Sequence, residues 1–116
     1  MDKVSIAVAS GDGKVVNVHF GKARKFYIYE LEDDKFTFKE LREYPPACSG
    51  EGHDDDKLRE NLKNISDCDY LVIAKIGDRA ATLAENEGIV PYEIPGDIEE
   101  SLEQLNKFLK VKELFN

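Results

Sequence analysis

The chain has 116 residues, 41% of them hydrophobic and 34% charged, a balance that favours one globular domain over residues 1–116. No apolar run is long enough to span a membrane and no signal-peptide core follows Met1, so we expect a cytoplasmic protein without membrane contact. The formal net charge of -8 argues against nucleic-acid binding, because neutralising phosphates requires a basic surface.

The first 44 residues predict an antiparallel meander of three or four strands. Alternating apolar positions predict a strand over residues 3–9, and the two glycines of residues 10–13 predict a tight turn with positive φ angles. Three valines at positions 15, 16 and 18 predict a short second strand. Aromatic and β-branched residues predict further strands over residues 25–31 and 36–44.

Helical periodicity begins after two prolines that end the meander. Leu58, Leu62 and Ile65 share one face of the predicted helix, and the aspartates at residues 54–56 cap it and favour the positive end of its dipole. The near-continuous apolar run of residues 68–74 then predicts a buried strand.

The second half contains a predicted βαβ unit, in which residues 71–76 and 89–94 are parallel strands and residues 78–87 are the helix between them. Asp78 is the expected N-cap of that helix, and Gly88 is the expected residue just after its end. Pro91 predicts that the later strand lies at a sheet edge, because proline cannot donate to a β ladder.

A third helix is predicted from a capping-box-like pair, Asp97 and Glu100, followed by an apolar stripe that includes Leu102 and Leu105. The whole order predicts an α/β fold in which helices pack on a mixed sheet.

Soft metal ligands are concentrated in one short loop. Cys48 and His53 bound it, and Gly50 and Gly52 let its backbone approach a bulky ligand. Thiolate and imidazole bind zinc, copper or iron-sulfur species, but two ligands are too few for a closed four-coordinate zinc site. They suit an open site or a preassembled cluster, and His19 is a third ligand if the meander brings it to this loop.

An anion-binding edge is predicted where the buried strand meets the next helix. Ligands of open α/β sheets bind beyond the carboxyl ends of parallel strands, where residues 77–79 lie. Exposed N–H groups at a helix start favour an anion. Arg79, Lys22, Arg24 and Lys25 add positive charge there despite the acidic total.

Each of these residues also has an ordinary structural interpretation. Cys48 can be a simple loop cysteine, His53 part of a helix entry, and His19 a residue that packs on its aromatic neighbour. Residues 77–79 can be an unremarkable strand-to-helix junction. Cys68 begins a buried strand and is expected to be an inert core thiol.

Several segments together resemble the dinitrogenase iron-molybdenum cofactor biosynthesis family. The resemblance spans about residues 3–105, and it is the order and spacing of the segments that carry it. It is to the small cofactor-carrier proteins and to the carboxyl-terminal domain of the radical enzyme that builds the cofactor precursor. The segments are Ala-Ser-Gly-Asp-Gly at residues 9–13, His-Phe-Gly-Lys-Ala at 19–23, Phe-Tyr-Ile-Tyr-Glu at 26–30, Cys48 with its glycine-rich loop to Asp55, and Asp67-Cys68 with Ile76-Gly77.

The resemblance implies a ribonuclease-H-like α/β fold, with a five-stranded mixed sheet and about three helices. It implies binding and transfer of an anionic iron-sulfur or iron-molybdenum cofactor or its precursor, without catalysis, and partners that assemble or accept that cofactor. The candidate metal ligands are His19, Cys48 and His53. The candidate cofactor-binding residues are His19, Gly21, Cys48, Gly50, Gly52, His53 and Arg79.

Two other functions were weighed against this one. A metal-free protein-interaction or regulatory domain is the main alternative. A metal-dependent nuclease is suggested only by analogy of fold. Such a nuclease requires several carboxylates converging on two metal ions, and the strand of residues 3–9 has no acidic residue at its centre.

Overall fold

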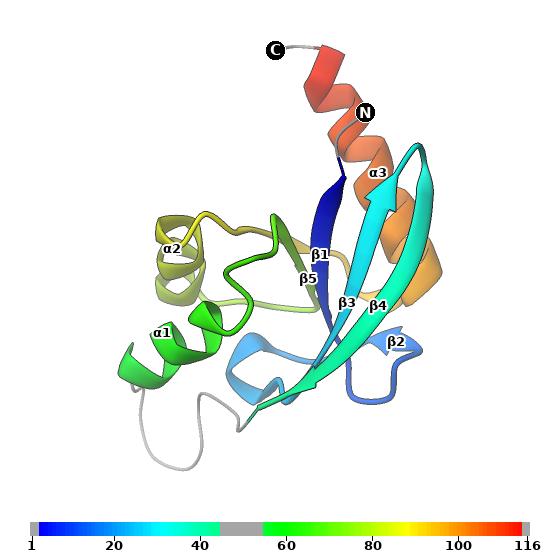
Figure 1. Cartoon of the computed structure of the whole chain (residues 1–116). Helices are drawn as coiled ribbons and strands as arrows, with labels where there is room; N and C mark the ends of the chain where they lie inside the picture. The colour runs from blue at the N-terminus through cyan, green and yellow to red at the C-terminus, as the bar shows by residue number, and fades with distance from the viewer. Residues whose placement is uncertain (1–2, 45–54, 115–116) are drawn as a thin grey trace.

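The main sheet has five strands in the spatial order β4-β3-β1-β5-β6. The computed structural model describes residues 3–44 and 55–114 (Figure 1). The strands are β1 (Val4–Ala9), β3 (Lys25–Glu32), β4 (Lys35–Glu43), β5 (Tyr70–Ile73) and β6 (Val90–Glu93). The pairs β1/β3 and β3/β4 are antiparallel, whereas β1/β5 and β5/β6 are parallel. This is the mixed sheet that the order of elements predicted, in the ribonuclease-H-like form that the family resemblance implies.

Helices cover both faces of the sheet (Figure 1). On one face, α1 (Asp55–Lys63) and α2 (Asp78–Asn86) contribute Leu58, Leu62 and Ala84 to a buried core. On the other face, α3 (Ile98–Leu114) contributes Leu102 and Leu105 to a second core. The apolar periodicity that predicted these helices therefore marks the faces that the sheet buries.

The sequence predicted that Val15, Val16 and Val18 form a strand of the meander, and this placement is wrong. Only β2 (Val15–Val16) is a strand, and it pairs antiparallel with β7 (Gly96–Asp97) in a separate small sheet. The physical reason is burial, because Val16 is 1% exposed and packs in the core beneath α3. The chain then enters a short 3₁₀ helix, η1 (Phe20–Lys22), which leads into β3.

Two predictions about the turns and helix starts are corrected. In the turn of residues 10–13, only Gly13 has a positive φ angle, at 79°. Gly77, not Asp78, is the N-cap of α2, with no side-chain cap hydrogen bond, and Asp78 lies in the first helical turn.

Three other local predictions are confirmed. Asp97 Oδ2 accepts a hydrogen bond from Glu100 N at 3.2 Å at the start of α3. Gly88 follows α2 with a φ of 83°, as expected for the residue after a helix end. Pro91 lies on β6, the last strand of the sheet.

The loop with most of the predicted ligands cannot be placed. Cys48, Gly50, Gly52 and His53 lie outside the described residues, as does Asp54 of the predicted acidic cap. Their predicted roles therefore stay predictions.

Candidate functional site

A cavity of about 570 Å³ lies beyond the carboxyl end of β5. Because β1 and β5 run parallel, their carboxyl ends share one edge of the sheet, the lower edge in Figure 1. This is the edge at which open α/β sheets bind ligands. The cavity is lined by His19, Phe20, Gly21, Lys22, Leu58, Lys75, Gly77, Asp78, Arg79 and Ala80.

Backbone hydrogen bonds fix one wall of the cavity to the strand edge. His19 and Lys75 form a parallel β-bridge, in which Phe20 N donates to Lys75 O at 2.9 Å. Ala74 N also donates to Val18 O at 3.2 Å. The segment before η1 is thus paired directly with the chain that leaves β5. This pairing brings His19 and Gly21 to the same cavity as Arg79, as the site prediction requires.

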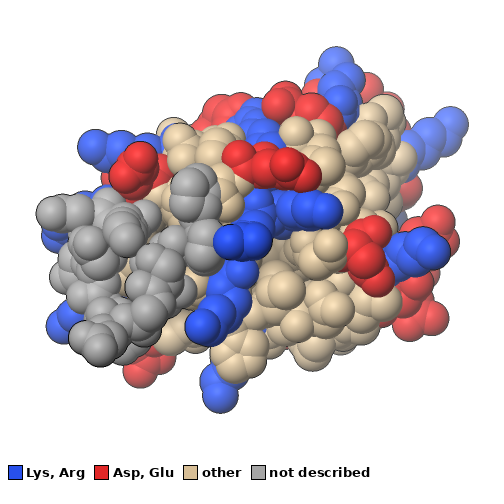
Figure 2. Space-filling view, turned by 90° about the horizontal axis from the view of Figure 1, so that it is seen from below, with Lys and Arg blue, Asp and Glu red and all other residues tan. Residues whose placement is uncertain are grey.

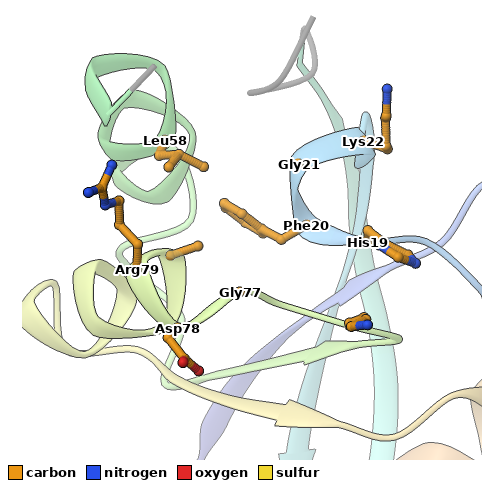
Figure 3. Close-up of a pocket in the computed structure, with 10 residues that line it drawn as sticks. His19, Phe20, Gly21, Lys22, Leu58, Gly77, Asp78 and Arg79 are labelled. Carbon is orange, nitrogen blue, oxygen red and sulfur yellow. The ribbon is translucent and has the colours of Figure 1, made fainter. Parts of the chain in front are cut away.

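The interior of the cavity is apolar. Phe20 is 1% exposed, and its ring packs on Phe26 with 6.2 Å between centroids. In Figure 3 the Phe20 ring points from η1 toward α1 and α2, and the imidazole of His19 points the other way. Leu58 of α1 and Ala80 of α2 are also buried. A ligand here would contact apolar side chains in the interior and the exposed imidazole of His19 at the rim.

The rim of the cavity is basic although the chain is acidic. Among the described residues, Lys22, Lys75 and Arg79 line it, together with one carboxylate, that of Asp78. Figure 2 shows basic side chains gathered across the middle of this end of the molecule. Arg79 also stands in the first turn of α2, whose N-terminal amides carry partial positive charge. The rim therefore favours an anion.

The predicted basic residues are only partly in the site. Lys22 and Arg79 line the cavity, but Arg24 and Lys25 do not, and Lys25 pairs with Glu43 at 3.9 Å. Lys75 was missed by the sequence prediction. Its only signal was a charged residue directly after a buried apolar run, and that pattern is common at strand ends.

A metal site is not formed by the described residues alone. Among the side chains that the structure describes, in residues 3–44 and 58–114, no group of three or more His, Cys, Asp and Glu lies close enough to hold a metal ion. Cys68 is 3% exposed and belongs to the core. Burial, with the Asp67 carboxylate beside it, raises the pKa of the Cys68 thiol to about 12, so it is an inert thiol as predicted.

An α/β fold with an apolar cavity and a basic rim at the carboxyl edge of its strands has a geometry typical of ligand-binding domains. The family model for the dinitrogenase iron-molybdenum cofactor matches residues 2–107. The chain therefore belongs to the dinitrogenase iron-molybdenum cofactor family.

The relatives that match the chain include proteins with three different names. The chain is 36% identical over 101 residues to the FeMo cofactor biosynthesis protein NifB of Chlorobaculum tepidum, covering 84% of this chain and 22% of NifB. It is 28% identical over 111 residues to protein NifX of Sinorhizobium fredii, covering 90% of this chain and 69% of NifX. It is 33% identical over 105 residues to protein NifY of Klebsiella pneumoniae, covering 89% of this chain and 44% of NifY. The chain thus spans about a fifth of the length of the NifB relatives it matches.

Solved structures share the fold. The crystal structure of PH0822 superposes with a TM-score of 0.66 at 24% identity, covering 87% of each chain. The NMR structure of TM1290 from Thermotoga superposes with a TM-score of 0.61 at 19% identity, covering 90% of this chain and 88% of that one. In the part of the chain that the structure describes, no helix is long and apolar enough to cross a membrane.

Proposed function

We propose that this chain binds an anionic iron-sulfur or iron-molybdenum cofactor, or its precursor, and passes it on without catalysing a reaction. The cofactor is the cargo and not a resident group. Proteins that assemble the cofactor would supply it, and a cofactor acceptor would receive it. Membership of the family and the resemblance to NifX and NifY support this role in cofactor biosynthesis.

The observation that carries the proposal is the basic rim of the cavity. Three cationic side chains, those of Lys22, Lys75 and Arg79, line a cavity of about 570 Å³. The chain as a whole has a net charge of -8. A local excess of positive charge in an acidic protein favours a compact anion over an extended polyanion such as nucleic acid. The cavity volume lies within the range of small-molecule and cofactor sites.

The proposed ligands come from two separate segments of the chain. His19 stands at the rim of the cavity, on a segment fixed to Lys75 by backbone hydrogen bonds. Cys48 and His53 are proposed to ligate from the loop that precedes α1, a helix whose Leu58 lines the same cavity. One thiolate and one or two imidazoles would hold a cluster reversibly, and reversible ligation suits a protein that must release its cargo.

Anaerobic titration with isolated iron-molybdenum cofactor tests the proposal. Binding should produce a new charge-transfer absorbance with a saturable endpoint. We expect His19→Gln, Cys48→Ala and His53→Ala each to weaken binding by about tenfold, the usual size of the loss of one metal ligand or its support. The exposed Lys107 lies on α3, which does not line the cavity, so Lys107→Gln is the matched control.

Two outcomes would contradict the proposal in different ways. If the wild-type chain gives no saturable signal, the cargo role is wrong, and a metal-free interaction domain becomes the better account. If the wild type binds but all three variants bind equally well, the cargo role survives and the ligand assignment is wrong.

A further inference from the structure

The segment of residues 74–77, here called the rim segment, connects β5 to α2 and supplies Lys75 and Gly77 to the cavity. Its first half is fixed on one side, where Ala74 N donates to Val18 O and Lys75 O accepts from Phe20 N. The position of the cavity wall therefore depends on what holds the other side of the rim segment.

The ladder between β5 and β6 ends before the rim segment begins. The last paired residues are Ile73 and Glu93, and Ile94 N donates to Ile73 O at 3.0 Å. The chain then turns away to β7, which pairs with β2 and not with β5. The backbone of β6 thus cannot hold the rim segment.

The side chain of Glu93 provides a hydrogen-bond acceptor for the rim segment beyond the last backbone pair of β5 and β6. Glu93 Oε2 accepts a hydrogen bond from Ile76 N at 2.9 Å. Ile76 stands between Lys75 and Gly77, both of which line the cavity. A carboxylate bonded to a backbone N–H makes a charge-assisted hydrogen bond, which is stronger than one between neutral groups.

We propose that Glu93 is a positioning residue for the cofactor site. It holds the rim segment so that Lys75 faces the cargo and α2 begins at the correct place. The inference rests on the proposed function, since it concerns the same cavity. Glu93 itself does not line the cavity, so it acts through Ile76 N.

The charge of Glu93 and its acceptor oxygen should have opposite effects on cofactor binding, so variants that separate the two test the proposal. A negative charge next to the cavity repels an anionic cargo, whereas the acceptor oxygen orders the wall that binds it. Glu93→Gln removes the charge and keeps an acceptor oxygen. Glu93→Ala removes both, so a comparison of the two variants isolates the hydrogen bond.

The first measurement is anaerobic titration of both variants with isolated iron-molybdenum cofactor. We expect Glu93→Gln to bind at least as tightly as the wild type, and Glu93→Ala to bind about threefold or more weakly than Glu93→Gln, as expected for one exposed hydrogen bond. The exposed Glu103 on α3 provides the control, for which the Gln and Ala variants should bind alike.

The second measurement does not require cargo. Amide hydrogen exchange by NMR should show Ile76 N–H protected in the wild type and in Glu93→Gln, and faster by about threefold or more in Glu93→Ala. Equal exchange in all three proteins overturns the inference, as does equal cofactor affinity of the Gln and Ala variants. If the wild type binds no cofactor, the proposed function fails instead, and the role of Glu93 at a cofactor site fails with it.

Discussion

Arg42 joins the end of β4 to the chain just before β5. Its guanidinium donates to both carboxylate oxygens of Asp67, at 2.7 and 2.8 Å, and to Asn64 O at 3.0 Å. The side chain of Arg42 is 16% exposed, whereas that of Asp67 is 65% exposed. This bidentate ion pair fixes the edge of the sheet to the turn that follows α1.

The ion pair should make stability depend on pH in the acid range. Hydrogen bonds from Arg42 hold the pKa of Asp67 below its ordinary value of 3.8. Because the pKa is lower in the folded state, the stabilisation is present above the unfolded value and is lost as pH falls through the folded value. We expect Asp67→Asn to cost about 0.5–1 kcal/mol at pH 7, after allowing for solvent screening of an exposed carboxylate. Urea unfolding at pH 7 and pH 2.5 would measure this.

The control for this prediction is the comparison of the wild type with Asp67→Asn at low pH. The stability difference between the two proteins should be smaller at pH 2.5 than at pH 7, because protonation of Asp67 removes the charge that the variant also lacks. A difference that stays constant across that range would show that the variant acts through packing and not through charge.

At the scale of elements, periodicity was enough to find the main strands and helices. Apolar residues recur at regular spacing in the meander, in the βαβ unit and along α3, and this periodicity can be recognised in a sequence. The sheet of β2 and β7 was not predictable, because each strand has two residues and its partner is about 80 positions away in the chain. Gly77 is the N-cap in place of Asp78 because α2 begins one residue earlier than side-chain preferences suggest.

The place of the cavity was predictable to a similar degree. Its edge followed from the rule that ligands bind at the carboxyl ends of parallel strands, and the cavity contains His19, Gly21 and Arg79. Lys75 was missed because its role depends on the bridge to His19, which no local pattern specifies. Phe20 belongs to the buried core and also forms part of the wall of the cavity.

The turn between β1 and β2 should tolerate no side chain at Gly13. A Cβ there would lie 2.9 Å from ring atoms of Tyr27, and the φ angle of 79° adds backbone strain. We expect Gly13→Ala to destabilise the fold by about 2 kcal/mol or more, since strain and overlap both contribute. Urea unfolding monitored by tyrosine fluorescence or circular dichroism would measure this.

Gly88 is the matched control for this substitution. It has a φ angle of 83°, but a Cβ there would meet nothing within 4 Å. Gly88→Ala should therefore cost only about 1 kcal/mol, from strain alone. Equal losses at the two positions would show that the contact with Tyr27 contributes nothing.

For the whole molecule, the important feature is the uneven distribution of charge. A chain of net charge -8 places Lys22, Lys75 and Arg79 around one cavity at one end of its sheet. The attraction of a compact anion to this rim is partly screened by salt, whereas apolar contacts inside the cavity are not. Cofactor affinity should therefore fall as ionic strength rises and reach a plateau at high salt, where the apolar contacts still hold the cofactor.

The basic rim can be tested by neutralising its lysines singly. We expect Lys22→Gln and Lys75→Gln each to weaken cofactor binding by about two- to fivefold at low salt, with a smaller effect at high salt, as expected for partly exposed charges. Lys107→Gln, away from the cavity, should change neither the affinity nor its salt dependence. Variants at the rim that bind like the wild type at low salt would exclude an electrostatic role for these lysines.

The central claim is that the cargo occupies this cavity, and paramagnetic broadening of amide NMR signals tests it most directly. Isolated iron-molybdenum cofactor, added anaerobically to the isotope-labelled chain, should broaden the amides of residues 19–22 and 75–80 most strongly. Amides near Asp34 and Lys110, which join the β3–β4 turn to α3 at the opposite end of the sheet, should stay sharp. Broadening centred on that opposite end, or spread evenly over the molecule, would contradict the account.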